Sequence, residues 1–314
     1  MKTGEKSGVP DEEFIRMFTT LGPVETSRMC NIGIRNVYRR RKRLEERYDK
    51  PIPIPSRTPI EFHSERRIFN VDTGVILVGS DAHYWPGIST TAHRAFLSFI
   101  KKLKPVAVVL NGDVFDGASI SRHPAINYED RPQVADEIAA CTERLEEIED
   151  AAGKAKLFWT LGNHDARFES RLAQVAPEFI RVQGTELKDH FPNWLPGWSL
   201  LINDKVMVKH RYKGGIHATH NNTMSAGLTM VTGHLHSLKV TPWTDYNGTR
   251  WGVDTGTMAD IHGPQFKEYM EDNPRNWRSG FAVLTFKKGE LLWPELVYVM
   301  DVGIVEFRGE RFEV

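Results

Sequence analysis

The chain has 314 residues, enough for two domains or for one large and one small domain. Its 40% hydrophobic and 26% charged residues are typical of a soluble globular protein, and no apolar run is long enough to span a membrane. Lys and Arg balance Asp and Glu at 41 each, but residues 28–47 hold eight Lys or Arg against two Glu, and this net charge of +6 favours a locally anionic partner.

The first residues and the cysteines indicate a cytoplasmic protein. The opening segment, MKTGEKSGVPDEEF, contains no apolar stretch of signal-peptide length. The only cysteines, Cys30 and Cys141, are far apart, have no metal-like spacing and argue against a disulfide framework. We expect no membrane partner.

Residues 11–47 have the pattern of three helices. Apolar residues recur at helical spacing up to Gly22, a short helix follows Pro23 and ends before Gly33, and IRNVYRRRKRLEERY forms a third, basic helix. A short helix, a glycine turn and a basic helix in this order resemble a helix-turn-helix. We therefore predict a small all-α DNA-binding domain over residues 1–50, which favours a homodimer.

The basic helix supplies the side chains that would contact DNA. Residues near its start would reach the bases, and the following basic residues would contact phosphates. The alternative is a solvated basic face, or helices that serve oligomerisation. The predicted DNA-binding residues are Arg35, Asn36, Arg39, Arg40, Arg41, Lys42 and Arg43.

A proline-rich segment, DKPIPIPSRTPI, follows the helices. Its prolines at positions 51, 53, 55 and 59 exclude a helix and favour an extended spacer. We predict a linker over residues 51–60 and a second domain over residues 61–314.

The second domain has an α/β pattern. Apolar, β-branched runs predict strands at VILVGS, VAVVLNG, LFWTLGN, KVMVKH and LTMVTGH, and later at FAVLTF, ELVYVM and GIVEF. Helices are predicted at TTAHRAFLSFIKKLK and QVADEIAACTERLEEIEDAAGK. These elements favour a mixed or two-sheet core with helices outside.

Polar side chains follow the first five of these strands. In an α/β sheet the carboxyl ends of strands converge on one crevice, where such folds place their sites. Imidazole and carboxylate ligands without thiolates favour Mn, Fe, Zn or Ni. Two divalent ions held by two carboxylates and neutral ligands would leave a net positive site, suited to a phosphate ester. In chain order the residues are Asp81 and His83, then Asp113 and Asp116, then Asn163, His164 and Asp165, then His210, then His234 and His236.

The segments SDAH, NGDVFD, LGNHD, VKH and TGHLH, in this order, resemble the motifs of calcineurin-like metallophosphoesterases. The resemblance extends over about residues 75 to 237. It implies the family's fold, two mixed β-sheets packed face to face with flanking helices, and a hydrolase with two divalent metal ions. We favour Mn²⁺, with Fe, Zn or Ni as alternatives.

The resemblance also assigns roles to individual positions. His164 would face the substrate, and Asp165 would orient His164 from behind. Two-metal chemistry then implies that a bridging hydroxide attacks phosphorus in line with the leaving oxygen. One metal would be held by Asp81, His83, Asp113 and His236, and the second by Asp113, Asn163, His210 and His234.

Some positions keep two interpretations. The family usually places a Gly beside the fourth-motif His, whereas KHRYKGGIHATH also offers His217 and His220; we favour His210 because it directly ends a strand. Asp116 is either a hydrogen-bond acceptor behind the site or a helix cap. Arg167 and His123 are candidate substrate-binding residues, with a surface ion pair and a solvated loop as the respective alternatives.

Three functions follow from these features. We favour a phosphodiesterase or nuclease that acts on DNA and is targeted by its N-terminal helices, a domain combination typical of phages. The second is a phosphomonoesterase or small-molecule phosphodiesterase whose N-terminal helices serve oligomerisation. The third is a non-enzymatic DNA-binding protein with a relict metal fold, which the filled ligand positions disfavour.

Overall fold

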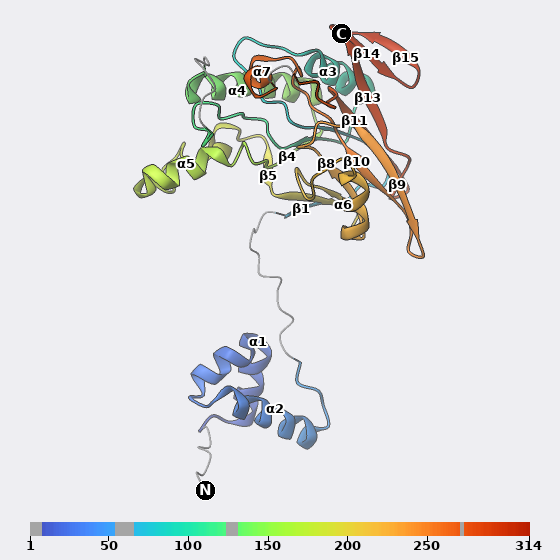
Figure 1. Cartoon of the computed structure of the whole chain (residues 1–314). Coiled ribbons are helices and arrows are strands. Elements are labelled where there is room, and N and C mark those ends of the chain that lie inside the picture. The colour runs from blue at the N-terminus through green and yellow to red at the C-terminus, as the bar shows by residue number, and fades with distance from the viewer. Residues whose placement is uncertain (1–7, 54–65, 124–130, 271–272) are drawn as a thin grey trace. The chain divides into compact units, whose positions relative to one another are not determined.

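The computed structural model describes residues 8–53, 66–123, 131–270 and 273–314. The chain divides into two compact units, residues 1–64 and 65–314 (Figure 1). Residues 54–60 of the predicted linker lie outside the described residues.

The N-terminal unit is a small helical body with its own core. It contains α1 (Asp11–Met29) and α2 (Ile34–Tyr48). At Gly22 the backbone leaves helical geometry, with φ 79° and ψ 174°, so that α1 is two helical segments joined at a kink, at the predicted boundary before Pro23. The core is formed by apolar side chains that recur at helical spacing, among them Phe14, Phe18, Val37 and Leu44.

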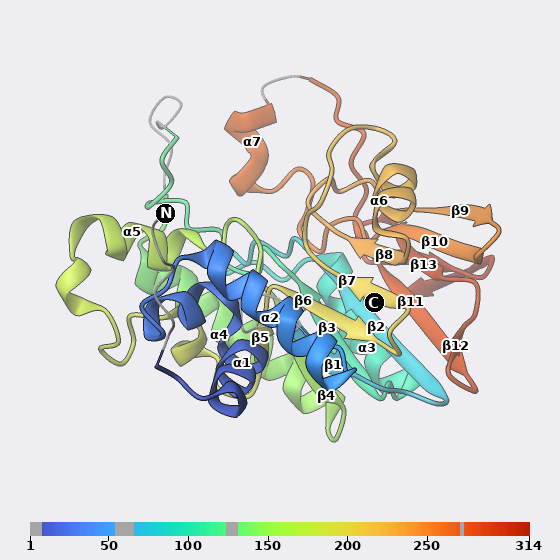
Figure 2. The ribbon, with the colours of Figure 1, turned by 90° about the horizontal axis from the view of Figure 1, so that it is seen from below.

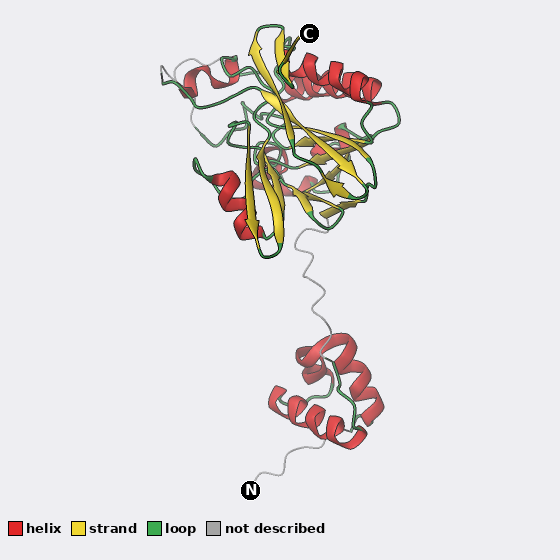
Figure 3. Ribbon diagram, turned by 90° about the vertical axis from the view of Figure 1, so that its right-hand side faces the viewer, coloured by secondary structure: helices red, strands yellow, loops and turns green. Residues whose placement is uncertain are grey.

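Two mixed sheets form the centre of the second unit (Figure 3). The larger sheet has the strand order β15-β14-β13-β11-β2-β3-β4-β5, with β12 beside β11, and the smaller has the order β1-β6-β7-β8-β10-β9. The strands of the larger sheet are β2 (Gly74–Gly79), β3 (Ala107–Asn111), β4 (Lys156–Thr160), β5 (Leu195–Gly197), β11 (Gly280–Lys287), β12 (Glu290–Leu291), β13 (Glu295–Asp301), β14 (Ile304–Phe307) and β15 (Glu310–Glu313). Those of the smaller are β1 (Arg66–Phe69), β6 (Ser199–Ile202), β7 (Val206–Val208), β8 (Thr229–Thr232), β9 (Lys239–Asp245) and β10 (Gly248–Asp254).

Alternating side chains of the larger sheet serve two cores. Ile76 and Val78 of β2 pack with Val208 and Val231 of the smaller sheet, whereas Leu77, between them in sequence, joins a second core on the other face. That second core is covered by α3 (Thr91–Leu103) and α4 (Val134–Ala152). The predicted fold, two mixed sheets packed face to face with flanking helices, is therefore confirmed.

Shorter helices complete the second unit. Helix α6 (Ala218–Ala226) packs on β8, β9 and β10, and Figure 2 shows it beside these strands. None of the described helices combines the length and the apolar character needed to cross a membrane. The shorter helices are α5 (Arg167–Val175), η1 (Pro177–Phe179), η2 (Leu187–His190), α6 (Ala218–Ala226) and α7 (Pro264–Met270).

Candidate functional site

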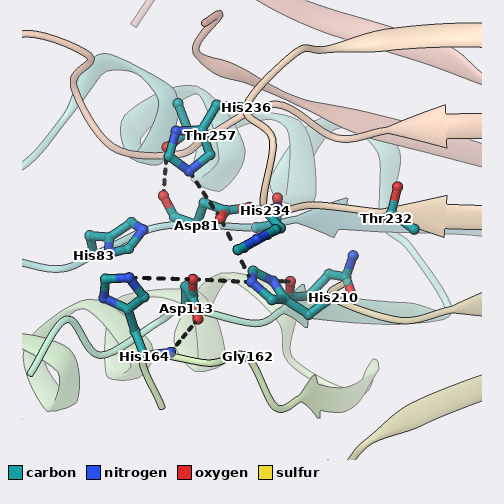
Figure 4. Close-up of polar contacts among 12 residues, drawn as sticks. Asp81, His83, Asp113, Gly162, His164, His210, Thr232, His234, His236 and Thr257 are labelled. Carbon is teal, nitrogen blue, oxygen red and sulfur yellow. Dashed lines mark hydrogen bonds and ion pairs between the residues drawn. The ribbon is translucent and has the colours of Figure 1, made fainter. Parts of the chain in front are cut away.

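Five strand ends meet at one place in the second unit. Strands β2, β3 and β4 are parallel neighbours in the larger sheet, and β7 and β8 are parallel neighbours in the smaller. The segments that leave their carboxyl ends carry the predicted ligand residues. Figure 4 shows two carboxylates, Asp81 and Asp113, surrounded by the imidazoles of these segments.

The first group of candidate metal ligands is Asp81, His83 and His236. All three side chains are buried, and their ligand atoms lie within 4.8 Å of one another. His236 Nε2 is 3.0 Å from Asp81 Oδ1. The Nδ1 atom of His83 lies 2.7 Å from Asp116 Oδ1, which leaves the Nε2 atom of His83 available for a metal.

The second group is Asp113, His210 and His234, again within 4.8 Å. His210 Nδ1 lies 2.8 Å from the Asn111 carbonyl oxygen, to which it donates, and this bond leaves Nε2 as the basic nitrogen. That Nε2 atom is 3.0 Å from Asp113 Oδ2 and 4.0 Å from Asp81 Oδ1. His210 therefore lies between the two carboxylates, and the two groups adjoin.

The chemistry of this cluster fits cations. Among the described residues, Asn163 Oδ1 and His236 Nδ1 are buried and have no hydrogen-bond partner, whereas buried polar atoms are normally paired. Burial alone would lower the pKa of His210, but the charges of Asp113 and Asp81 outweigh it and raise that pKa to about 10. The carboxylates thus attract positive charge, and the N and O donors around them suit two divalent ions of the Mn, Fe, Zn and Ni class.

The backbone of these segments is strained. A non-glycine residue with positive φ is uncommon, and such strain concentrates at functional sites. Five of the predicted ligand residues have a positive φ: Asp81 (φ 52°), His83 (40°), Asp113 (52°), His234 (72°) and His236 (54°). Buried carboxylates that accept backbone N–H groups hold these segments in their strained conformation.

Asp165 is one of these carboxylates, and its contacts correct the predicted role. It is fully buried and accepts hydrogen bonds from Trp159 Nε1 and from four backbone N–H groups, those of Gly162 and residues 113–115, at 2.8–3.1 Å. No contact with the His164 side chain is found within the described part of the chain. Asp165 faces the segment behind the site, so it fastens the Asp113 backbone rather than orienting the imidazole.

Asp116 takes the position that the resemblance assigned to Asp165. Its Oδ1 atom lies 3.0 Å from His164 Nδ1 and 2.7 Å from His83 Nδ1. Burial lowers the pKa of His164, but the charge of Asp113, the hydrogen bond that His164 donates to Asp116 and the charge of Asp116 raise it overall. Asp116 is thus the hydrogen-bond acceptor behind the site, one of the two roles that the sequence left open.

Arg167 lies against the same imidazole. Its Nη2 atom is 3.1 Å from His164 Nε2, and Nη1 donates to the Asp116 carbonyl oxygen at 2.9 Å. The His164 side chain is 21% exposed, against 2% for Asp113, so the imidazole and the guanidinium lie at the accessible side of the cluster.

The other candidate histidines lie elsewhere. His123 is exposed on a loop, where only its backbone has contacts among the described residues. His217 is exposed beside the start of α6, and His220 packs its ring edge-on against Trp243, with centroids 5.0 Å apart. Neither His217 nor His220 belongs to the two ligand groups described above.

Two further buried carboxylates hold the site and were not predicted. Asp254 accepts N–H bonds from Ser237, Leu238 and Gly256, which fastens the segment after His236. Glu137 of α4 has no exposed surface and accepts the N–H groups of Gly117 (3.1 Å) and Ala118 (3.0 Å), directly after Asp116. In sequence Glu137 looks like any acidic residue of an amphipathic helix.

Relative to a Glu137→Gln variant, we expect the protein to lose stability as the pH rises from about 5 to about 8. Burial raises the pKa of Glu137 to about 7 from 4.5, although the N–H groups of Ala118 and Gly117 oppose this. The folded state therefore binds this proton more tightly, so the contribution of the group is complete below pH 4.5 and is lost as the pH rises through about 7. Urea unfolding of both proteins across this range measures the difference. A difference that stays constant or changes in the other direction contradicts the prediction.

The predicted DNA-contacting residues of α2 fall into two sets. Arg40 bonds Asp11 Oδ1 at 2.7 Å and covers the Phe14 ring at 4.6 Å, and Arg41 bonds Glu45 at 2.9 Å. These two side chains are thus engaged within the helical unit, because they pack over its aromatic core. The exposed ones are Arg35, Asn36, Arg39, Lys42 and Arg43.

Comparison with known proteins gave matches in both sequence and structure. A family model described as calcineurin-like phosphoesterase matches residues 74–266, which include all five strand ends of the site. The gene 54 protein of Mycobacterium phage L5 is 26% identical, over 70% of this chain and 92% of that protein. The solved structures that match include the Escherichia coli phosphoesterase Yfce (14% identity, TM-score 0.33, 70% of this chain and 97% of that chain) and Chaetomium thermophilum Vps29 (8% identity, TM-score 0.37, 72% of this chain and 88% of that chain).

Proposed function

Since the chain belongs to the calcineurin-like phosphoesterase family, we propose that it is a dinuclear-metal phosphodiesterase that cuts DNA. The observation that carries the first part is the pair of adjoining ligand groups around Asp81 and Asp113. The exposed basic side chains of α2 support the second part.

Each ligand group would hold one divalent ion. The first ion would be bound by Asp81, His83 and His236, and the second by His210, His234 and Asn163, whose buried amide oxygen has no partner among the described residues. Asp113 would contribute to both. When bound, the ions would supply the positive charge that activates water and neutralises phosphoryl oxygens.

His164 and Arg167 would act on the substrate directly. With Arg167 donating to Nε2, the imidazole proton lies on Nδ1 and is donated to Asp116. A phosphoryl oxygen is anionic and is therefore a stronger acceptor for Arg167 than a neutral imidazole. The guanidinium would turn to the substrate, and Nε2 of His164, whose pKa is raised, would then hold a proton for the leaving oxygen.

The exposed face of α2 would bind the DNA backbone. Arg35, Arg39 and Lys42 follow one another at helical spacing, and all three side chains are exposed. Basic side chains that neutralise phosphates release counterions, so the affinity must fall as salt rises.

The second candidate function is hydrolysis of a small phosphoester by an oligomer. It is favoured by exposed apolar side chains in the helical unit, such as Met29 (62%), Val24 (53%) and Leu21 (48%), which a second copy could cover.

We expect a triple Arg35→Gln, Arg39→Gln, Lys42→Gln variant to bind DNA more weakly and with a smaller salt dependence. The loss of three phosphate contacts should reduce the slope of log K against log salt by up to about 2.7. Fluorescence anisotropy with a labelled duplex at several salt concentrations measures this. The rate with a chromogenic diester, bis(p-nitrophenyl) phosphate, should not change.

A matched control replaces three exposed lysines of the second unit, Lys101, Lys154 and Lys156, by Gln. It removes the same charge and should keep both the affinity and the slope. If the two variants lose affinity equally, net charge rather than α2 determines binding. If the wild type binds no DNA and is a stable oligomer that hydrolyses the chromogen, the second candidate function is correct.

A further inference from the structure

A cavity of about 670 Å³ opens between the segment that follows β2 and the start of α4. Its wall includes Trp85, Arg131, Gln133, Asp136 and Glu143. We propose that this cavity binds one unpaired nucleobase of the DNA substrate, beside the phosphodiester that is cut. The inference rests on the proposed function, and it defines the preferred substrate as single-stranded.

Two residues of the cavity wall are linked to the candidate metal centre independently of each other, so the cavity lies near that centre. Trp85 follows His83 by two residues, so their Cα atoms are at most about 7 Å apart. On the other wall, Arg131 Nη1 donates to the carbonyl oxygen of Ala118 at 3.3 Å, and Ala118 follows Asp116 by two residues. A substrate that places a phosphate at the metal centre could therefore place an adjacent base in the cavity.

The lining suits a flat, uncharged ring with polar edges. Trp85 is half-buried and lines the cavity, so part of its indole is accessible from the cavity for stacking. The volume is within the range of small-molecule sites. Stacking on an aromatic side chain is how proteins bind the bases of single strands without sequence preference.

The charges of the lining favour a base over a phosphate. The wall holds Arg131, Asp136 and Glu143, and Glu143 is paired with Arg144, so these groups give no net positive charge that would attract a phosphate. The Asp136 carboxylate, and the Glu143 oxygen that Arg144 does not bond, can accept hydrogen bonds from the amino groups of adenine, cytosine or guanine. The exposed amide of Gln133 can donate as well as accept.

A base in this cavity cannot also be stacked and paired in a duplex. The protein would have to unstack it at a cost of a few kcal/mol, whereas a single strand avoids most of this cost. The wild type is therefore expected to cut single strands faster than the same sequence in a duplex.

The test compares Trp85→Ala and Trp85→Phe in the full-length protein with Mn²⁺ added. The substrates are a single-stranded oligonucleotide, an oligonucleotide of equal length built from abasic residues, and bis(p-nitrophenyl) phosphate. Trp85→Ala should lower kcat/KM for the single strand about ten-fold or more, as expected for loss of base stacking, and Trp85→Phe should retain most of the activity. Both variants should match the wild type on the abasic strand and the chromogen, which also shows that the metal centre beside Trp85 is intact.

Two results would overturn the inference while the proposed function stands. Either Trp85→Ala cuts single-stranded DNA as fast as the wild type does, or its rate falls equally on the abasic strand. If the wild type hydrolyses the chromogen but no DNA, the proposed function fails, and this inference fails with it.

Discussion

Replacing Asp113 by Asn is expected to lower kcat/KM for phosphodiester hydrolysis about a thousand-fold and to reduce the bound metal. Asp113 is 2% exposed, lies 3.0 Å from His210 Nε2 and accepts the backbone N–H of His164 at 2.8 Å. An amide removes the negative charge between the two ligand groups and points an NH₂ group at one of these partners. Breaking a buried charge interaction costs about 3–5 kcal/mol, and about 4 kcal/mol corresponds to three orders of magnitude in rate.

Measuring the metal content by inductively coupled plasma mass spectrometry distinguishes a loss of metal binding from a loss of catalysis with the metal bound. The matched control is Asp204→Asn, an exposed aspartate in the turn before β7, which should retain both metal and rate. An Asp113→Asn protein that keeps two ions and near-normal activity would show that the centre lies elsewhere.

The Asp165→Ala variant should lose more than about 4 kcal/mol of unfolding free energy, the largest stability effect that we expect. The side chain is completely buried and accepts five hydrogen bonds, including those from Trp159 Nε1 and the Asp113 backbone. Truncation leaves these donors buried and unpaired, and each costs about 1–3 kcal/mol. Because three of these donors, the N–H groups of residues 113–115, belong to the strained Asp113 segment, activity should fall as well.

Urea unfolding of the wild type and the variant measures this loss. Asp189→Ala is the matched control, because Asp189 is exposed and accepts a single backbone N–H, that of Gly184. Its loss should stay within about 1 kcal/mol. If both variants lost the same unfolding free energy, the burial of Asp165 and the number of its hydrogen bonds would not contribute to the stability of the protein.

The sequence predicted the elements that combine a strong apolar pattern with a polar end. Strands β2, β3, β4, β7 and β8 are buried runs of β-branched or other apolar residues, and the chemistry follows at their ends. Within each sheet the ends meet because parallel strands share an edge, and the packing of the two sheets on each other brings the two edges together. Strand β9 (KVTPWTD) and helix α6 (ATHNNTMSA) escaped prediction, because the first contains a proline and has no fully buried residue and the second has no apolar stripe.

Side-chain directions could not be predicted. His164 and Asp165 are neighbours in sequence, yet one faces the cluster and the other the backbone behind it, and only the folded turn decides which. Arg40 appears in sequence as one more basic residue, but the packing of α1 on α2 places it over Phe14 and against Asp11. Glu137 acquires its role solely because α4 brings it to the loop after Asp116.

The most direct test of the central claim is the rate of bis(p-nitrophenyl) phosphate hydrolysis by chelator-treated protein before and after addition of Mn²⁺. We expect no turnover without metal and recovery when Mn²⁺ is restored, because Asp81, Asp113 and the surrounding imidazoles form two groups that fit cations. Hydrolysis that persists without metal, or that no ion among Mn, Fe, Zn and Ni restores, would contradict a dinuclear-metal phosphodiesterase.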